Sequence, residues 1–226
     1  MASSIVPAVE PVLRLDFDHG GPGCVLGPIA LSLLPGETVA LTGPSGVGKT
    51  SLLRIAAGLD GTFRGHREAT ERLAVVFQEP TLLPWRTALQ NLIIIARITE
   101  DQAQVWLEKV GLAGFGDRFP GALSLGQQRR LSLARAFAGA PDLLLMDEPF
   151  VSLDPVLATD MMRVFEDLRA ARPCATLIVT HVQAEAERLA GRILRLEGRP
   201  ARLIEDDQKA GAYFQLSASG VTTSRS

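Results

Sequence analysis

The strongest indication of the fold is the stretch Gly43-Pro44-Ser45-Gly46-Val47-Gly48-Lys49-Thr50. It fits the pattern G-x-x-x-x-G-K-[ST], in which the backbone N–H groups of a glycine-rich loop surround the phosphates of a nucleotide. The lysine of such a loop reaches the β- and γ-phosphates, and the hydroxyl of its last residue reaches Mg²⁺. Lys49 and Thr50 therefore predict a site for a nucleoside triphosphate with its metal ion.

The residues on either side of this loop agree with that prediction. Residues 37–42 have the pattern of a strand, and residues 49–57 contain good helix formers and end at Gly58, a typical C-terminal cap. A strand, a glycine-rich loop and a helix in this order are the context that the phosphate-loop pattern requires. The helix N-terminus would also direct its positive end at the bound phosphates.

Further strands and helices alternate along the chain. We expect strands at residues 12–17, 29–34, 73–77, 142–146, 175–180 and 192–197, and helices at 87–97, 101–110, 124–138 and 183–190 and after Asp154. This alternation predicts an α/β fold with a mostly parallel sheet that is covered on both faces. Residues 87–138 contain no clear strand, and residues 210–226, rich in Ser, Thr, Gly and Ala, indicate a frayed tail.

Composition limits the classes of protein to which the chain can belong. The 226 residues are enough for one domain, and 23 Lys and Arg against 25 Asp and Glu give a formal charge of −2. The net charge therefore shows no excess of basic residues, which nucleic-acid-binding proteins typically have. Cys24 and Cys174 are far apart and have no metal-ligand spacing, so we expect two free thiols. The N-terminus does not resemble a signal peptide, and no apolar run approaches the ~20 residues that a spanning helix needs.

A second chemical motif is Leu143-Leu144-Leu145-Met146-Asp147-Glu148-Pro149. Its apolar run predicts a buried strand, which places Asp147 and Glu148 at the carboxyl edge of the sheet, where ligands bind in open α/β folds. One carboxylate there can hold Mg²⁺ and its neighbour can orient or deprotonate the attacking water. Taken without the phosphate loop, the same two residues would be ordinary solvated loop acids.

A third segment, Leu123-Ser124-Leu125-Gly126-Gln127, precedes that strand. Alone it reads as a helix start with a capping box, because Ser124 is followed three residues later by Gln127. In this order with the other two motifs, however, it is similar to the LSGGQ signature of the ABC transporter family. The chain thus resembles, over residues 12–199, the ATPase subunit of ABC transporters. Leu125 replaces the first glycine of the signature, and its backbone N–H survives that change, so phosphate binding can persist.

The resemblance implies a role for each of a set of residues. It implies a P-loop NTPase domain of ABC type over residues 1–209, with an N-terminal antiparallel β portion, an inserted helical subdomain near 87–138, and ATP and Mg²⁺ as cofactors. The ATP-binding residues would be Gly43, Pro44, Ser45, Gly46, Val47, Gly48, Lys49, Thr50, Ser51 and His19, with His19, or alternatively Phe17, stacked on adenine. Asp147, Thr50 and Gln78 would hold the metal, and the catalytic residues would be Glu148 as general base, His181 and Gln78. Another copy's ATP would be bound by Ser124, Leu125, Gly126 and Gln127, and Asp154 would lie in the loop that crosses between the copies.

Two phrases, residues 78–85 and 147–154, are similar to the nitrate, sulfonate and taurine importer branch of that family. We therefore expect an ATP-hydrolysing subunit, peripheral at the cytoplasmic face of the inner membrane, that pairs with a second and identical ATPase subunit. Its other partners would be separate permease subunits and, indirectly, an extracytoplasmic solute-binding protein, with no nucleic acid. Trp85 would help to form the groove for the permease, or else would pack within the helical subdomain.

Three other functions use the same phosphate loop. A non-transport ABC ATPase, such as an iron–sulfur assembly ATPase, is disfavoured by residues 82–85. A chromosome-maintenance ATPase would need a long heptad coiled coil between its motifs, and the sequence contains none. A small-molecule kinase would leave residues 123–127 unexplained.

Overall fold

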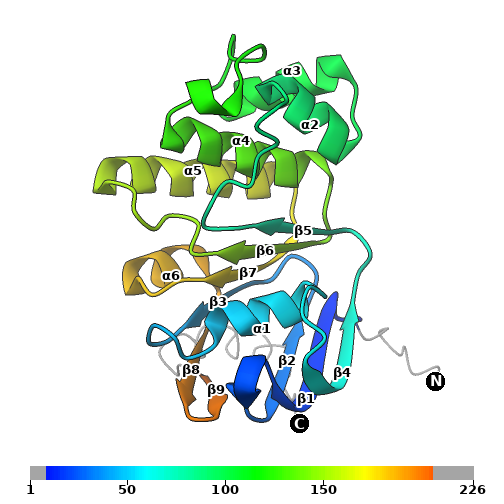
Figure 1. Cartoon of the computed structure of the whole chain (residues 1–226), viewed down its shortest axis with the longest axis vertical. Helices are drawn as coiled ribbons and strands as arrows, with labels where there is room; N and C mark the ends of the chain where they lie inside the picture. Colours follow the sequence, from blue (N-terminus) through cyan, green and yellow to red (C-terminus); the bar gives the residue numbers. More distant parts are fainter. Residues whose placement is uncertain (1–8, 206–226) are drawn as a thin grey trace, which may run out of the picture.

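The structure is a computed structural model, and it describes residues 9–205. The tail predicted over 210–226 lies outside the described residues. The described chain forms two sheets, with one helix between them and the other helices on the far side of the larger sheet (Figure 1). Within it, no helix combines the length and the apolar character that a membrane crossing requires.

The larger sheet has six strands and carries the phosphate loop. Its order is β5–β6–β7–β3–β8–β9, formed by β5 (Leu73–Val76), β6 (Leu143–Asp147), β7 (Ala175–Val179), β3 (Thr38–Thr42), β8 (Arg192–Gly198) and β9 (Ala201–Glu205). All neighbours are parallel except β8 and β9, which pair antiparallel. The predicted mostly parallel sheet is therefore confirmed.

The smaller sheet is antiparallel and is the expected N-terminal β portion. Its order is β2–β1–β4, from β2 (Ile29–Leu33), β1 (Leu13–Gly20) and β4 (Phe63–Ala69). Side chains along β1 alternate between buried and exposed, as the pattern of residues 12–17 predicts. β1 is the central strand of this sheet, and the strands on either side of Pro35 and Gly36, β2 and β3, belong to different sheets.

The helices divide between the faces of the larger sheet. Helix α1 (Lys49–Ala56) lies between the two sheets and contacts both. On the opposite face lie α2 (Ala88–Ala96), α3 (Glu100–Lys109), α4 (Leu125–Ala138) and α5 (Pro155–Ala171), with α2 to α4 at the upper end of Figure 1. Helix α6 (Gln183–Leu189) packs on β3, and two short 3₁₀ turns, η1 (Pro22–Cys24) and η2 (Pro120–Ala122), complete the order.

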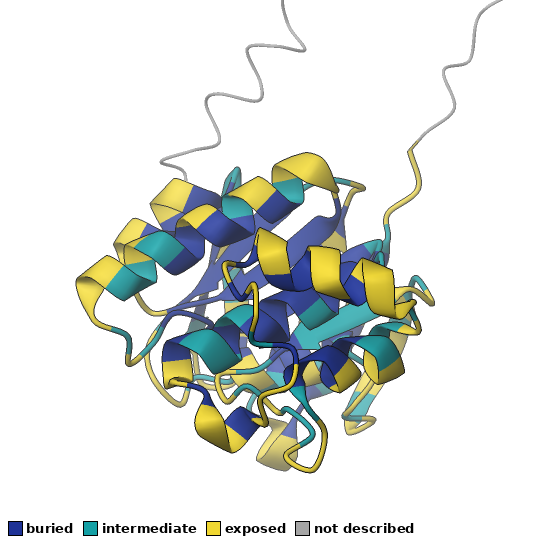
Figure 2. Cartoon of the chain, turned by 90° about the horizontal axis from the view of Figure 1, so that it is seen from above, coloured by how far each residue is buried: buried dark blue, intermediate teal, exposed yellow. Residues whose placement is uncertain are grey.

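Strand β6 shows how the core forms on both faces of the sheet. Its residues are all buried, and successive side chains point to opposite faces. Leu143 and Leu145 join the cluster around α1 and the antiparallel sheet, whereas Leu144 and Met146 join the cluster under α4 and α5. Figure 2 shows the same arrangement from above, with buried strands inside and exposed residues on the outer faces of the helices. Asp147 ends this doubly buried strand at the edge where the phosphate loop lies.

Local capping sets where three of the helices begin. Thr99 and Ser124 each form a capping box with the glutamine three residues later, a spacing that predicts this motif from the sequence. Asp154 caps α5, and its carboxylate accepts hydrogen bonds from the backbone N–H groups of Val156 and Leu157. The signature segment (residues 123–127) is therefore a rigid helix start.

Two strands, β4 and β9, were not expected from the sequence. Between Phe63 and Ala69, β4 contains Arg, Gly, His and Glu and no apolar alternation, so period-2 patterning cannot find it. It exists because its backbone pairs with β1 over most of its length. Likewise β9 is short and largely exposed, and it is held by pairing with β8.

Candidate nucleotide-binding site

The phosphate loop takes its shape from backbone conformations that favour glycine. Gly43 and Gly48 have φ of 140° and 114°, in the region that L side chains rarely adopt. A Cβ at Gly43 would lie 2.4 Å from the backbone oxygen of Leu196, and one at Gly48 would lie 2.8 Å from Cδ2 of Leu26. Glycine at both positions thus lets the loop fit between β8 and the start of α1.

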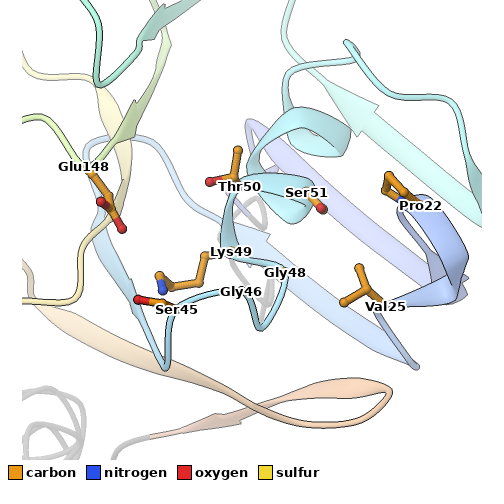
Figure 3. A pocket seen from close by; sticks show the side chains of 9 residues that line it. All are labelled: Pro22, Val25, Ser45, Gly46, Gly48, Lys49, Thr50, Ser51 and Glu148. Atoms are coloured by element: carbon orange, nitrogen blue, oxygen red, sulfur yellow. The ribbon is translucent and has the colours of Figure 1, made fainter.

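This loop forms the floor of an open pocket of ≈ 330 Å³ (Figure 3). The residues that line the pocket are Pro22, Val25, Ser45, Gly46, Gly48, Lys49, Thr50, Ser51 and Glu148. Glu148 lies on one side of the phosphate loop, and Pro22 with Val25 lies on the other. Six of these nine residues belong to the predicted phosphate-binding stretch and its continuation at Ser51.

Lys49 supplies the positive charge of the pocket. Its side chain is only 6% exposed, and Nζ donates hydrogen bonds to the carbonyl oxygens of Gly43 at 2.8 Å and Pro44 at 2.9 Å. Burial lowers the pKa of Lys49, while the carboxylates of Glu148 and Asp147 favour its charged form. A buried ammonium group, held by hydrogen bonds at the bottom of a glycine-rich loop, can bind the negatively charged phosphates of a nucleotide.

Thr50 and Asp147 bring two oxygen atoms together beside Lys49. The hydroxyl of Thr50 donates to Oδ1 of Asp147 at 3.2 Å, which joins the start of α1 to the end of β6. Asp147 is 7% exposed, and this burial raises its pKa, an effect that the Thr50 hydrogen bond opposes. Within residues 9–205 no cluster of three or more His, Cys, Asp or Glu side chains could hold a metal. Two hard oxygen ligands nevertheless fit Mg²⁺, which keeps several waters and takes its other ligands from phosphates.

Glu148 occupies a strained position directly after β6. Its φ is 45°, in the left-handed region, and its backbone N–H donates to the carbonyl oxygen of Val179 at 2.9 Å. Its side-chain Oε1 lies 3.2 Å from Nδ1 of His181, which follows β7. Strained backbone of this kind concentrates at functional sites. The structure therefore brings together two residues that the sequence assigned to catalysis separately.

Two other assigned residues do not reach the pocket. Gln78 is exposed beyond the end of β5, next to β6 in the sheet, but it does not line the pocket. His19 is half-buried on β1 and does not line it either. Phe17 is a core residue, 3% exposed, whose ring centroid lies 5.7 Å from that of Phe63. The roles of Gln78 and His19 remain predictions, and Phe17 cannot stack on a base without leaving the core.

Sequence reasoning missed Pro22 and Val25, which provide the apolar wall of the pocket. Residues 18–23 contain three glycines and a proline, which indicate a turn; Pro22 lies within that turn and Val25 lies beyond it. In the structure β1 extends to Gly20, and η1 then directs Pro22 and Val25 toward the phosphate loop. The sequence signal that could have identified this wall is Val25, an apolar residue two positions after Gly23.

The signature segment lies away from the pocket of its own chain. Ser124 accepts a hydrogen bond from the backbone N–H of Gln127 at 3.2 Å, and its own N–H donates to the Gln127 side chain at 2.9 Å. Leu125 is 46% exposed, whereas Gly126 is buried, and a Cβ on it would lie 2.9 Å from Cδ2 of Leu157. None of these residues lines the nucleotide pocket of the described chain.

Comparison with known proteins identifies the family. The model of the ABC transporter family matches residues 26–151, more than half of the chain. The chain belongs to the ABC transporter family. As an ABC ATPase it binds and hydrolyses ATP, which agrees with the phosphate loop and with the carboxylates at the end of β6.

Curated relatives cover most of this ABC ATPase. The aliphatic sulfonates import ATP-binding protein SsuB of Granulibacter bethesdensis is 44% identical over 191 residues, which are 83% of this chain and 80% of that protein. SsuB 1 of Pseudomonas aeruginosa is 42% identical over 197 residues, 79% of this chain and 78% of that protein. The dimeric ATP-binding cassette MJ0796, solved in a post-hydrolysis state with ADP and Pi, has a TM-score of 0.74 and 26% identity, and the match covers 86% of this chain and 97% of that one.

Proposed function

We propose that this chain is the ATP-hydrolysing subunit of an importer for aliphatic sulfonates, and that it drives permease subunits carried on other chains. Two relatives named as sulfonate import ATP-binding proteins, at 42–44% identity over about four-fifths of the chain, support the direction and the solute class. The geometry that carries the ATPase part is the set of Lys49, Thr50 and Glu148 around one pocket. Membership of the ABC family supports this function over that of a small-molecule kinase.

Residues around the pocket divide the work of hydrolysis. Lys49 and the N–H groups of the loop bind the β- and γ-phosphates. Thr50 and Asp147 would hold Mg²⁺, which would neutralise charge on the phosphates. Glu148 then orients the attacking water and takes its proton as general base. Because Glu148 is already fixed in a strained conformation, little reorganisation is needed when ATP arrives.

His181 contributes from the neighbouring strand. Its Nδ1 lies 3.2 Å from Oε1 of Glu148. As the imidazolium, His181 would donate to that carboxylate through Nδ1 and to the γ-phosphate through its other ring nitrogen. Gln78 would join the site as a ligand of Mg²⁺ and water. Because Gln78 is exposed and outside the pocket, this role requires its loop to move inward when nucleotide binds.

A second copy completes the site. In a two-fold pair the same surfaces are used reciprocally, so the signature segment of one copy, Ser124 to Gln127, closes over the ATP of the other. The dimeric state of the neighbour MJ0796 supports this pairing. Asp154 would position the crossing loop through its cap on α5, since its carboxylate is engaged by two backbone N–H groups.

The pair would bind peripherally at the cytoplasmic face of the inner membrane through its permease, and it would be coupled indirectly to an extracytoplasmic solute-binding protein. Residues 1–209 would form the ABC ATPase domain, with residues 87–138 as its helical subdomain. Co-purification of the chain with its permease, followed by uptake assays with an aliphatic sulfonate and with nitrate, tests the proposal. Sulfonate uptake that needs this chain supports it, whereas nitrate uptake alone would contradict the solute class.

Trp85 gives the permease contact a residue-level test. Its side chain is 68% exposed in the loop between β5 and α2, so packing within the helical subdomain does not account for it. Large exposed aromatic residues are typical anchors of protein interfaces, and truncation of such an anchor costs on the order of 2 kcal/mol or more. We expect Trp85→Ala to weaken association with the permease and to leave ATP binding unchanged. The matched control is Leu59→Ala, at an exposed apolar residue after α1, which should assemble normally.

A further inference from the structure

Arg129 is a buried cation on α4, and its side chain contacts the loop of residues 148–152 that follows β6. Its side chain is 7% exposed, and its Nη1 donates to the carbonyl oxygens of Val151 and, at 3.4 Å, of Pro149. Among residues 9–205 no ion pair involves Arg129, in contrast to its neighbour Arg130, which pairs with Asp160. Arg129 therefore directs its charge at the backbone that follows Glu148.

That backbone is strained at both ends. Glu148 and Ser152 have φ of 45° and 61°, although neither is a glycine. Such conformations persist only where surrounding contacts hold them. Within the loop the contacts are the hydrogen bond from the N–H of Val151 to the carbonyl oxygen of Glu148, at 3.3 Å, and the buried ring of Phe150. The guanidinium of Arg129 adds hydrogen bonds to the carbonyl oxygens of Pro149 and Val151, between the two strained residues.

The surroundings of Arg129 leave it no other partner among the described residues. It lines a small cavity of ≈ 10 Å³ together with Ser132, Met146, Pro149 and Phe150, among others. Arg129 Nε and Ser132 Oγ are both buried there without a hydrogen-bond partner in the described part of the chain. A cavity of this size holds at most one water, so no anion can enter to neutralise the guanidinium. Burial accordingly lowers the pKa of Arg129.

We propose that Arg129 is a positioning residue for ATP hydrolysis, which holds the carbonyls of Pro149 and Val151 and so keeps Glu148 in its left-handed conformation. This inference rests on the proposed role of Glu148 as general base. Arg129 lies two residues beyond the signature segment on the same helix, α4. The general base is thus fixed to the helix that begins at Ser124, and a displacement of α4 moves both.

The variant Arg129→Met removes the donors and keeps a long apolar side chain. Because a displacement of about 1 Å in a catalytic group can cost ~10²-fold, we expect kcat to fall by ~10–100-fold, with the Kd for Mg-ATP unchanged within about twofold. Arg129→Lys should recover much of kcat, because an ammonium can still donate to both carbonyls. Both are measured on the full-length chain at saturating Mg-ATP, with Kd from calorimetry.

Arg169→Met is the matched control. Arg169 also has a buried Nε without a hydrogen-bond partner among the described residues, and it donates to a loop carbonyl, that of Gly36 at 3.1 Å. The loop that contains Gly36 joins β2 to β3, and it lies at the end of β3 opposite the phosphate loop. We expect Arg169→Met to lower thermal stability as Arg129→Met does and to keep the wild-type kcat.

The outcomes separate this inference from the function on which it rests. Wild-type kcat in Arg129→Met, beside an inactive Glu148→Gln, overturns the positioning role alone, whereas normal hydrolysis by Glu148→Gln overturns the role of the base. Equal loss of kcat in the Arg169→Met control, or no recovery with lysine, indicates a merely structural arginine. If Arg129→Met does not fold, hydrogen exchange of residues 148–152 in Arg129→Gln decides. Faster exchange than in the wild type supports the inference, and equal exchange overturns it.

Discussion

At the phosphate end of the pocket, polar side chains are held by hydrogen bonds, whereas the opposite end offers apolar surface. Lys49 is bound to the carbonyls of its own loop, and Glu148 to His181. Pro22 and Val25, in contrast, contribute apolar side chains from a segment that precedes the phosphate loop. We infer that the protein holds the phosphates by hydrogen bonds and surrounds the rest of the nucleotide with apolar surface.

The largest expected effect is at Glu148 and concerns chemistry alone. Glutamine keeps the size of the side chain and can hydrogen-bond water, but it cannot accept a proton. Since a positioned general base contributes ~10²–10⁴-fold in rate, Glu148→Gln should lose hydrolysis by that factor and retain ATP binding. The variant should then accumulate as an ATP-bound dimer, which sizing chromatography with Mg-ATP detects, with and without the permease. Near-normal hydrolysis would refute the assignment.

Lys49→Ala tests binding at the same end. The lysine contacts phosphate, and a hydrogen bond to a charged group contributes about 1.5–3 kcal/mol, so the Kd for ATP should rise by roughly 10–150-fold. Inorganic tripolyphosphate, which has no base or sugar, should lose affinity to the same degree. Calorimetry with both ligands measures this. An unchanged Kd for either ligand would mean that this loop does not hold the phosphates.

The two ends of the pocket also differ in how far the sequence predicted them. The phosphate end follows from one contiguous stretch, because residues 43–50 specify both the loop and the start of α1. Asp147 and Glu148 were also predictable, since an apolar run such as β6 must be buried and its end must reach the sheet edge. The apolar end could not be predicted, because η1 is held there by long-range contacts, among them the pairing of β1 with β4 and the hydrogen bond from the N–H of Ala201 to the carbonyl oxygen of Val25. That pairing leaves no periodic signal in the polar sequence of β4.

Long-range contacts explain the remaining misses as well. The contact of Glu148 with His181 depends on β6 and β7 being neighbours, and no local pattern states which strands are adjacent. The contact of Arg129 with the loop after Glu148 depends in the same way on the packing of α4 against β5 and α5. In contrast, the capping boxes at Thr99 and Ser124 are local, and the sequence predicted both.

The smallest expected effects concern the apolar end of the pocket, where either Val25 or His19 contacts the adenine of ATP. Val25 lines the pocket and His19 does not. Removing two methyl groups from partly covered apolar surface costs about 1 kcal/mol, so Val25→Ala should raise the Kd for ATP about fivefold. The same variant should bind tripolyphosphate normally, because that ligand does not reach the apolar wall.

His19→Ala is the matched comparison, and we expect the Kd for ATP to stay within about twofold of the wild type. Calorimetry of both variants with ATP and tripolyphosphate distinguishes the two walls, and thermal unfolding checks that neither variant is merely less folded. A loss of ATP affinity in His19→Ala with none in Val25→Ala would support His19, and not Val25, as the adenine contact. It would then follow that β1 shifts when nucleotide binds, since His19 cannot line the pocket from the position that it occupies here.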